Sequence, residues 1–247
     1  VNAGLGNMGV SVVQFLSPII ISVGLFGVLG GESQTIVNKA GQSSEIWAQN
    51  AAFVWVPWII IISVAAWFFM NDIADAKASF ATQAAIFRSK HNWLMCILYL
   101  GTFGSFIGYA AGFPLLIKSQ FKEVNPLAYA WIGPLVGALI RPVGGWLSDK
   151  LGGARVTFWN FIVMALAVVG VLFFLPKGTG SAYALSIGPA EGSFTGFFLM
   201  FLVLFLTTGI GNGSTFRMIP VIFLNLKTRL VKRNDEAGMA AAVKEAN

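Results

Sequence analysis

Residues 125–157, NPLAYAWIGPLVGALIRPVGGWLSDKLGGARVT, decide the fold. They contain an apolar, glycine-rich helix with one cation, Arg141, well inside it, followed by a turn spaced Gly-x-Leu-x-Asp-x-x-Gly-x-x-Arg from Gly145 to Arg155. An arginine inside a membrane helix costs about 2.5–3.5 kcal/mol on insertion scales, so it is a functional-site hypothesis by default. The alternative is a structural arginine that bonds the carbonyl groups of a neighbouring helix.

The composition defines the class of protein. The chain is 56% hydrophobic and 11% charged, against about 25% charged in soluble domains, and apolar runs of about 20 residues recur. Such runs predict an all-α polytopic membrane helix bundle, because lipid-exposed backbone must be satisfied internally and the alternating ~10-residue strands of a barrel are not seen. With one cysteine, Cys96, the sequence has neither a disulfide framework nor a metal motif. No cofactor is expected.

Six spans are predicted, at residues 4–29, 51–70, 93–117, 127–148, 156–175 and 194–221. Alternate connections then lie on opposite sides of the membrane, and the cations divide ten against four between them. By the positive-inside rule, the richer side is cytoplasmic. The net charge of +6 is therefore assigned to loops and not to nucleic-acid binding. The ten cations on the predicted cytoplasmic side are Lys77, Arg88, Lys90, Lys150, Arg155, Lys227, Arg229, Lys232, Arg233 and Lys244.

Four segments carry a resemblance to a known family. Residues 2–10, NAGLGNMGV, and residues 99–108, YLGTFGSFIG, resemble the fifth and seventh helices of NarK-type nitrate/nitrite porters of the major facilitator superfamily. Arg141 with the turn at Asp149 resembles the eighth helix and the following inter-helix motif, and residues 209–220 resemble the tenth helix. The resemblance runs along nearly the whole chain.

The resemblance implies that the chain is a fragment, helices five to ten of twelve, with the major facilitator superfamily fold incomplete. Residues 1–70 would be the last two helices of the N-terminal bundle, residues 71–92 the cytoplasmic loop between bundles, and residues 93–247 the first four helices of the C-terminal bundle with a cytoplasmic tail. The expected partners include the missing N-terminal and C-terminal helices, which would hold a second substrate arginine and the second nitrate signature.

Three residues are expected to bind the substrate on one side of the cavity. Nitrate and nitrite are planar anions, and the guanidinium of Arg141 offers a planar fork of donors that a lysine lacks. Tyr99 and Phe103 are four residues apart and share a helix face. The tyrosine can donate to the anion, and the phenylalanine can stack on its plane. Ordinary aromatic packing remains the alternative for Phe103.

Further residues are assigned by the same resemblance. Asn7 is expected to donate to the anion, or alternatively to bond another helix. Asp149 and Arg155 are expected to form a cytoplasmic latch that breaks during rocking. Porters of this type can have Gln at the position of Arg217, which is interpreted here as an interface or gate residue. Close helix packing is expected at Gly4, Gly6, Gly9, Gly104, Gly108, Gly112, Gly209 and Gly213.

The expected function is alternating-access transport of nitrate and nitrite across the bacterial inner membrane. No Asp, Glu or His lies in a span core, which favours nitrate/nitrite antiport over proton-coupled symport, because proton coupling usually needs a titratable group in the path. Symport stays an alternative, with its proton site in the missing helices. An anion-binding membrane receptor or assembly subunit is a second class. An enzyme is disfavoured, because there is no histidine cluster, nucleophile–base pair or cofactor motif.

Overall fold

The computed structural model describes residues 2–25, 31–37, 42–71, 80, 84–177, 187–228 and 238. Two compact units emerge, one formed by Val12–Ala85 and the other by Val1–Ser11 with Ile86–Asn247. Among the described residues, five helices are long and apolar enough to cross a membrane, so the predicted helical membrane fold is confirmed. The predicted inter-bundle loop at 71–92 lies partly outside the described residues, and this division stays a prediction.

The five spans follow the predicted ones closely, with bounds Asn50–Phe69, Lys90–Gln120, Pro126–Leu151, Gly153–Phe174 and Phe194–Leu226. The first predicted span is shorter than expected, because α1 (Asn2–Ile21) ends eight residues before 29. The helix ends where the chain segment that contains Trp47 and Asn50 returns and bonds to residues 21 and 23. The Trp47 backbone N–H donates to the Ile21 carbonyl at 2.8 Å, and Asn50 Nδ2 donates to the Val23 carbonyl at 2.8 Å. Residues 26–30 lie outside the described part.

The connection after α1 contains a hairpin where the sequence predicted only a polar loop. Strands β1 (Gln34–Val37) and β2 (Ser43–Ile46) pair antiparallel, from Gln34 opposite Ile46 to Val37 opposite Ser43. The run Thr-Ile-Val within β1 is β-branched, which suits an extended strand. The short helix α2 (Asn50–Phe53) then leads into α3 (Trp55–Phe69), which has no buried residue within this chain.

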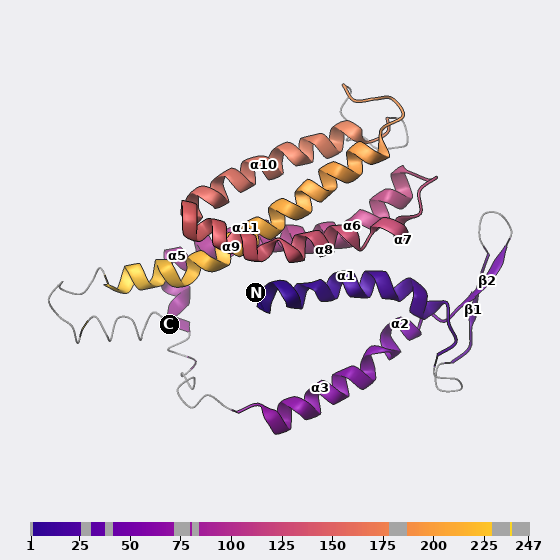
Figure 1. Ribbon diagram of the computed structural model, residues 1–247, viewed down its shortest axis with the longest axis horizontal. Coiled ribbons are helices and arrows are strands. Elements are labelled where there is room, and N and C mark those ends of the chain that lie inside the picture. Colours follow the sequence, from indigo (N-terminus) through magenta and orange to yellow (C-terminus); the bar gives the residue numbers. More distant parts are fainter. Residues whose placement is uncertain are drawn as a thin grey trace. The chain divides into compact units, whose positions relative to one another are not determined.

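The larger unit contains the segments that hold the candidate site. A 3₁₀ turn, η3 (Ala85–Arg88), precedes a helix made of α5 (Lys90–Tyr99), the π-helical segment η4 (Leu100–Gly104) and α6 (Ser105–Gln120). The next span is α7 (Pro126–Tyr129), α8 (Ile132–Leu139) and α9 (Arg141–Leu151). The last two helices, α10 (Gly153–Phe174) and α11 (Phe194–Thr228), pack along each other, and α8 and α9 pack on α11 (Figure 1).

The core of this unit is aromatic and lies between α6, α10 and α11. The ring of Phe113 stacks on that of Phe201 at 4.6 Å between centroids, and Phe106 meets Phe205 edge-on at 6.0 Å. The buried cluster comprises Phe106, Ala110, Phe113, Ile117, Met164, Ala167, Val171, Leu175, Phe197, Phe201, Leu204 and Phe205. By contrast, the opposite face of α10 exposes large apolar side chains such as Trp159 and Leu166, as expected of a surface that meets lipid.

Glycines bring α9 and α11 into backbone contact. A Cβ at Gly144 would overlap the backbone of Ile210, and a Cβ at Gly213 would overlap the carbonyl oxygen of Arg141. Small residues at such points let helix backbones approach closely. At the end of α9, Gly152 has φ +89, a conformation that only glycine adopts readily. This one residue links α9 to α10.

Candidate functional site

Arg141 is buried inside the bundle, with 5% of its surface exposed. It is the first residue of α9, just after a break in the helix at Ile140, which has φ −78 and ψ −13. The next residue, Pro142, has no backbone N–H, so the helix cannot continue its regular hydrogen bonding through this point, and proline is favoured in the first turn of a new helix. The sequence thus creates a local irregularity at the buried cation of the span.

Two phenyl rings contact the guanidinium of Arg141. Its Cζ atom lies 5.1 Å from the ring centroid of Phe103 and 5.1 Å from that of Phe106. The two rings are nearly parallel, with centroids 6.3 Å apart and an interplanar angle of 9°. Ring faces attract cations by about 0.5–2 kcal/mol, more when water is excluded. This arrangement stabilises a buried charge and restricts its position.

The ring of Phe103 is positioned by the π-helical segment η4. A π-helical turn inserts an extra residue into the helix, and such turns occur frequently at functional sites. The fully buried Thr102 supports it, because its hydroxyl donates to the carbonyls of Leu98 at 3.2 Å and Tyr99 at 3.3 Å. The side chain thereby satisfies carbonyl groups at the point where the α-helical hydrogen-bond pattern is interrupted.

Tyr99 lies beside this aromatic pair. Its ring is 5.2 Å from that of Phe103, so Phe103 has Tyr99 on one side and Arg141 on another. The structure thus brings these three predicted residues together. Asn7 is half-buried on α1, and no contact of its side chain with Arg141, Tyr99 or Phe103 is seen. Its predicted contact with the anion stays a prediction.

The glycines expected at packing surfaces divide into two groups. At Gly209 and Gly213 an added Cβ would overlap the backbone of α8 or α9. At Gly104 an added Cβ would approach only the Leu100 side chain of its own helix, at 3.0 Å. Four others, Gly6, Gly9, Gly108 and Gly112, have no described atom within 4 Å of such a Cβ. The surroundings of Gly4 lie outside the described part. For these residues a packing role stays a prediction.

Asp149 pairs with Arg217 and not with the predicted partner of its latch. The Nε atom of Arg217 donates to Asp149 Oδ1 at 2.7 Å, and the two side chains are 55% and 49% exposed, respectively. This ion pair joins the end of α9 to α11. Arg155 is exposed and forms no ion pair within the part of the chain that the structure describes. The sequence suggested Arg155 as the partner of Asp149 because both belong to one motif. Arg217 is 68 positions from Asp149.

Three features of the site were missed by the sequence reasoning. Phe106 follows Tyr99 by seven residues and Phe103 by three, a spacing that indicates one helix face and could have added it to the site. The pairing of Asp149 with Arg217 could have been suspected, because both were expected near the cytoplasmic ends of their spans. The π-helical segment has no residue signal in the sequence that we can identify.

The fold and the buried cation together define the class of protein. The chain is an integral membrane protein whose apolar helices enclose an arginine packed against two aromatic rings. No protein-family model matches the chain, but curated relatives do. It is 46% identical over 246 residues to the nitrate/nitrite transporter NarU of Salmonella typhimurium, covering 98% of this chain and 50% of that protein.

Two further relatives agree with the first. The chain is 46% identical over 250 residues to the nitrate/nitrite transporter NarU of Escherichia coli, with 99% of this chain and 50% of that protein covered. It is 42% identical over 225 residues to the "Probable nitrate/nitrite antiporter NarK2" of Thermus thermophilus, with 90% and 48% covered. The chain belongs to the NarK-type nitrate/nitrite porter family of the major facilitator superfamily. It spans about half the length of these relatives. These bacterial relatives place it in the inner membrane.

Proposed function

We propose that this chain carries one half of an anion site in a nitrate/nitrite transporter that works by alternating access, exchanging nitrate for nitrite. The observation that carries the proposal is the guanidinium of Arg141, 5% exposed, with its Cζ atom 5.1 Å from each of two ring centroids. The names of the relatives support the choice of substrate. The relatives are named as transporters, and we assign this chain no catalytic activity.

The chemistry of the site suits a small planar anion. A guanidinium can bond two oxygens of one anion at once, in a single plane. Phenyl rings hold the cation through their faces without offering it a strong hydrogen-bond acceptor, so the rings restrict the arginine and do not neutralise it. Tyr99, whose ring is 5.2 Å from Phe103, carries a hydroxyl that can donate to the same anion. Asn7 is proposed to complete the donors from the other bundle.

The placement of acidic residues supports exchange over proton coupling. The described acids are Glu32, Glu45, Glu123, Asp149 and Glu191. They lie in loops, in the strand β2 or at span ends. Asp149 is already engaged by Arg217. A proton-coupled carrier usually has a titratable group within the membrane path, and these spans offer none in their cores. Proton-coupled symport is the second candidate, and it would need its proton site in the half of the relatives that this chain does not span.

The substitution Arg141→Lys in a full-length transporter that contains this sequence tests the proposal. Lysine keeps the charge but loses the planar fork, so nitrate flux into proteoliposomes should fall at least tenfold. The matched control is Arg88→Lys, an exposed arginine in η3, which should keep its flux. Near-wild-type flux in Arg141→Lys, at equal protein in the membrane, would overturn the assignment of Arg141.

A further inference from the structure

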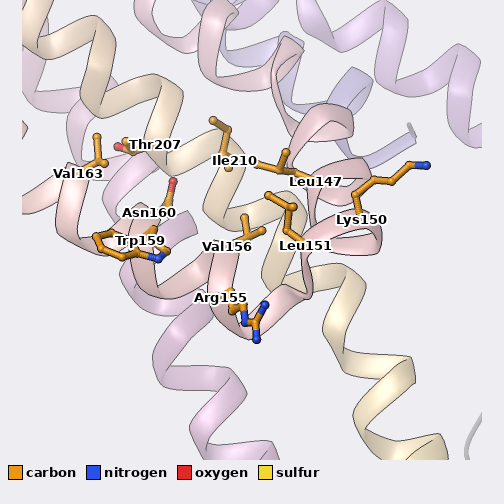
Figure 2. Close-up of a pocket in the computed structure, with 10 residues that line it drawn as sticks. All are labelled: Leu147, Lys150, Leu151, Arg155, Val156, Trp159, Asn160, Val163, Thr207 and Ile210. Carbon is orange, nitrogen blue, oxygen red and sulfur yellow. The ribbon is translucent and has the colours of Figure 1, made fainter.

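A groove of about 490 Å³ lies between α9, α10 and α11 (Figure 2). Its lining residues come from the end of α9, the first three turns of α10 and the middle of α11. They are Leu147, Lys150, Leu151, Arg155, Val156, Trp159, Asn160, Val163, Thr207 and Ile210. Arg141 is not among them, and of these residues only Arg155 was assigned a role by the sequence.

The groove is cationic at one end and apolar beyond it. Lys150 and Arg155 lie on either side of the one-residue link at Gly152, and both are exposed. Neither forms an ion pair within the described residues. The nearest carboxylate along the chain, Asp149, is bonded to Arg217. The two cations therefore present uncompensated positive charge at the mouth of the groove, on the side of the membrane that the positive-inside rule makes cytoplasmic.

The same end of the groove also has the start of a long helix. α10 is 22 residues long and begins at Gly153, and the free backbone N–H groups of a helix N-terminus favour an anion. Trp159, 63% exposed, is an amphipathic ring of the kind that gathers at the membrane–water interface. Two charged side chains and a helix start thus lie at this end of the groove, and the ring of Trp159 lies one turn further along α10.

A polar group lies deeper on the same wall. Asn160 is 6% exposed, and its Nδ2 has no hydrogen-bond partner in the described part of the chain. It follows Arg155 by five residues, which corresponds to about 7.5 Å along a helix. A buried amide without a partner is unfavourable, and a carboxamide can present either its oxygen or its N–H₂ group by a half-turn. Beyond it, Val163 and Ile210 are apolar.

We propose that this groove binds an anionic phospholipid. The phosphate is held by Lys150, Arg155 and the start of α10, the glycerol ester carbonyl accepts from the Asn160 amide, and an acyl chain lies along Val163 and Ile210. The order of chemistry in the groove, charge then amide then hydrocarbon, is that of a phospholipid from headgroup to chain. Basic pockets between membrane helices bind anionic headgroups by the same principle. The site is independent of nitrate transport and requires no nitrate.

Lipid binding to the full-length transporter, measured by native mass spectrometry in detergent, tests this proposal. Phosphatidylglycerol should bind at one saturable site, and phosphatidylcholine, which has the same chains without net charge, should bind at least tenfold more weakly. Glycerol phosphate, which has the anion without chains, should not bind at the same concentrations. Each cation near an anionic headgroup contributes about 1 kcal/mol, which is about a fivefold change in affinity. The double variant Lys150→Gln/Arg155→Gln should therefore bind phosphatidylglycerol about 25-fold more weakly.

Matched variants distinguish binding in the groove from nonspecific attraction to positive charge and from nonspecific binding to the apolar surface. Lys118→Gln/Lys122→Gln removes the same charge from exposed positions outside the groove and should leave phosphatidylglycerol affinity unchanged. Val163→Trp fills the apolar part and should abolish binding, whereas Leu166→Trp, on an exposed position outside the lining, should not. Equal binding of the two lipids, or an equal loss in the Lys118/Lys122 variant, would overturn the proposal. A third result would also overturn it: no saturable lipid binding to the unchanged protein, together with unfolding of Val163→Trp. That result would mean that protein side chains already fill the groove.

Discussion

At the scale of residues, the proposed site depends on how a buried cation is held. Arg141 has its guanidinium carbon 5.1 Å from the ring centroids of both Phe103 and Phe106, and Phe106 is itself 1% exposed. The rings fix the guanidinium in place before the anion arrives, so less side-chain freedom is lost on binding. Loss of a ring that contacts Arg141 should therefore lower nitrate affinity, in addition to the loss of stability that follows from poorer packing.

The substitution Phe106→Leu should weaken nitrate binding about three- to tenfold, because one of two cation–ring contacts is lost. The matched control is Phe113→Leu, a core ring that is 0% exposed and packs on Phe201, away from Arg141. Both variants remove a similar buried volume and should lower thermal stability by similar amounts. Nitrate affinities from thermal-shift titration of the full-length protein compare them. Equal nitrate affinity in the two variants would rule out a specific role for Phe106.

At the scale of elements, the contact between α9 and α11 depends on glycine. An added Cβ at Gly144 would overlap the backbone of Ile210, whereas one at the adjacent Gly145 would lie 3.8 Å from the Gly213 carbonyl oxygen, an ordinary contact. Since Arg141 begins α9 and its carbonyl oxygen faces Gly213, this helix contact also sets the position of the proposed site. Two neighbouring glycines thus have opposite tolerance for a side chain.

Gly144→Ala should destabilise the full-length protein by about 1–3 kcal/mol, because the backbones of α9 and α11 must separate. Gly145→Ala should be neutral or stabilising, since alanine is favoured over glycine in a helix by about 1 kcal/mol. Thermal unfolding in detergent, followed for both variants, measures the difference. A Gly144→Ala protein as stable as Gly145→Ala would contradict the close approach of these two helices.

The ion pair between Asp149 and Arg217 joins the end of α9 to α11. Both side chains are about half exposed, so the pair contributes little to stability. Its predicted role is in switching between conformations. Asp149→Asn should change the rate of nitrate exchange at least twofold, with little change in thermal stability, whereas Glu123→Gln, which removes an exposed carboxylate elsewhere, should not. Reversing the pair with Asp149→Arg and Arg217→Asp should restore the rate, and failure to do so would count against a latch at this pair.

The sequence predicted most of these elements and less of their detail. Length and apolarity were sufficient for the spans, because a membrane helix must satisfy its backbone within about 20 apolar residues. The sequence also predicted one site for Arg141, Tyr99 and Phe103. A charge within a span is rare, which singled out Arg141, and a spacing of four residues placed Tyr99 and Phe103 on one helix face. The π-helical η4 could not be predicted, because this local change of helix type has no clear residue signal. The hairpin was missed because each of its strands has only four residues. The pairing of Asp149 with Arg217 was missed because the two residues are 68 positions apart.

At the scale of the whole molecule, the chain spans about half the length of its relatives. Several surfaces lack a packing partner among the described residues. A Cβ added at Gly108 or Gly112 would have no described atom within 4 Å, and Asn7 is only half-buried. α11, with 35 residues, is about 52 Å long at 1.5 Å per residue and so exceeds the ~30 Å hydrocarbon core. These surfaces are suited to further helices of a complete transporter.

The isolated 247-residue chain should therefore insert into membranes without transporting nitrate. Its spans are long enough to insert, but a cavity between two bundles needs the helices of both. Protease protection of inverted vesicles would report insertion, and a nitrate titration of thermal stability would report binding. Stabilisation of the isolated chain by millimolar nitrate, absent in Arg141→Lys, would contradict the view that it holds only half of the site.

Nitrate exchange in proteoliposomes containing the full-length protein tests the central claim most directly. Since the spans described here have no acid in their cores, the anion itself should balance the charge of Arg141 as the site crosses between the two sides. We predict uptake of labelled nitrate when nitrate or nitrite is inside the vesicles, and little uptake into anion-free vesicles, even with an inward proton gradient. Robust proton-driven accumulation in anion-free vesicles would contradict exchange, and the absence of nitrate uptake under every condition would contradict the transport function itself.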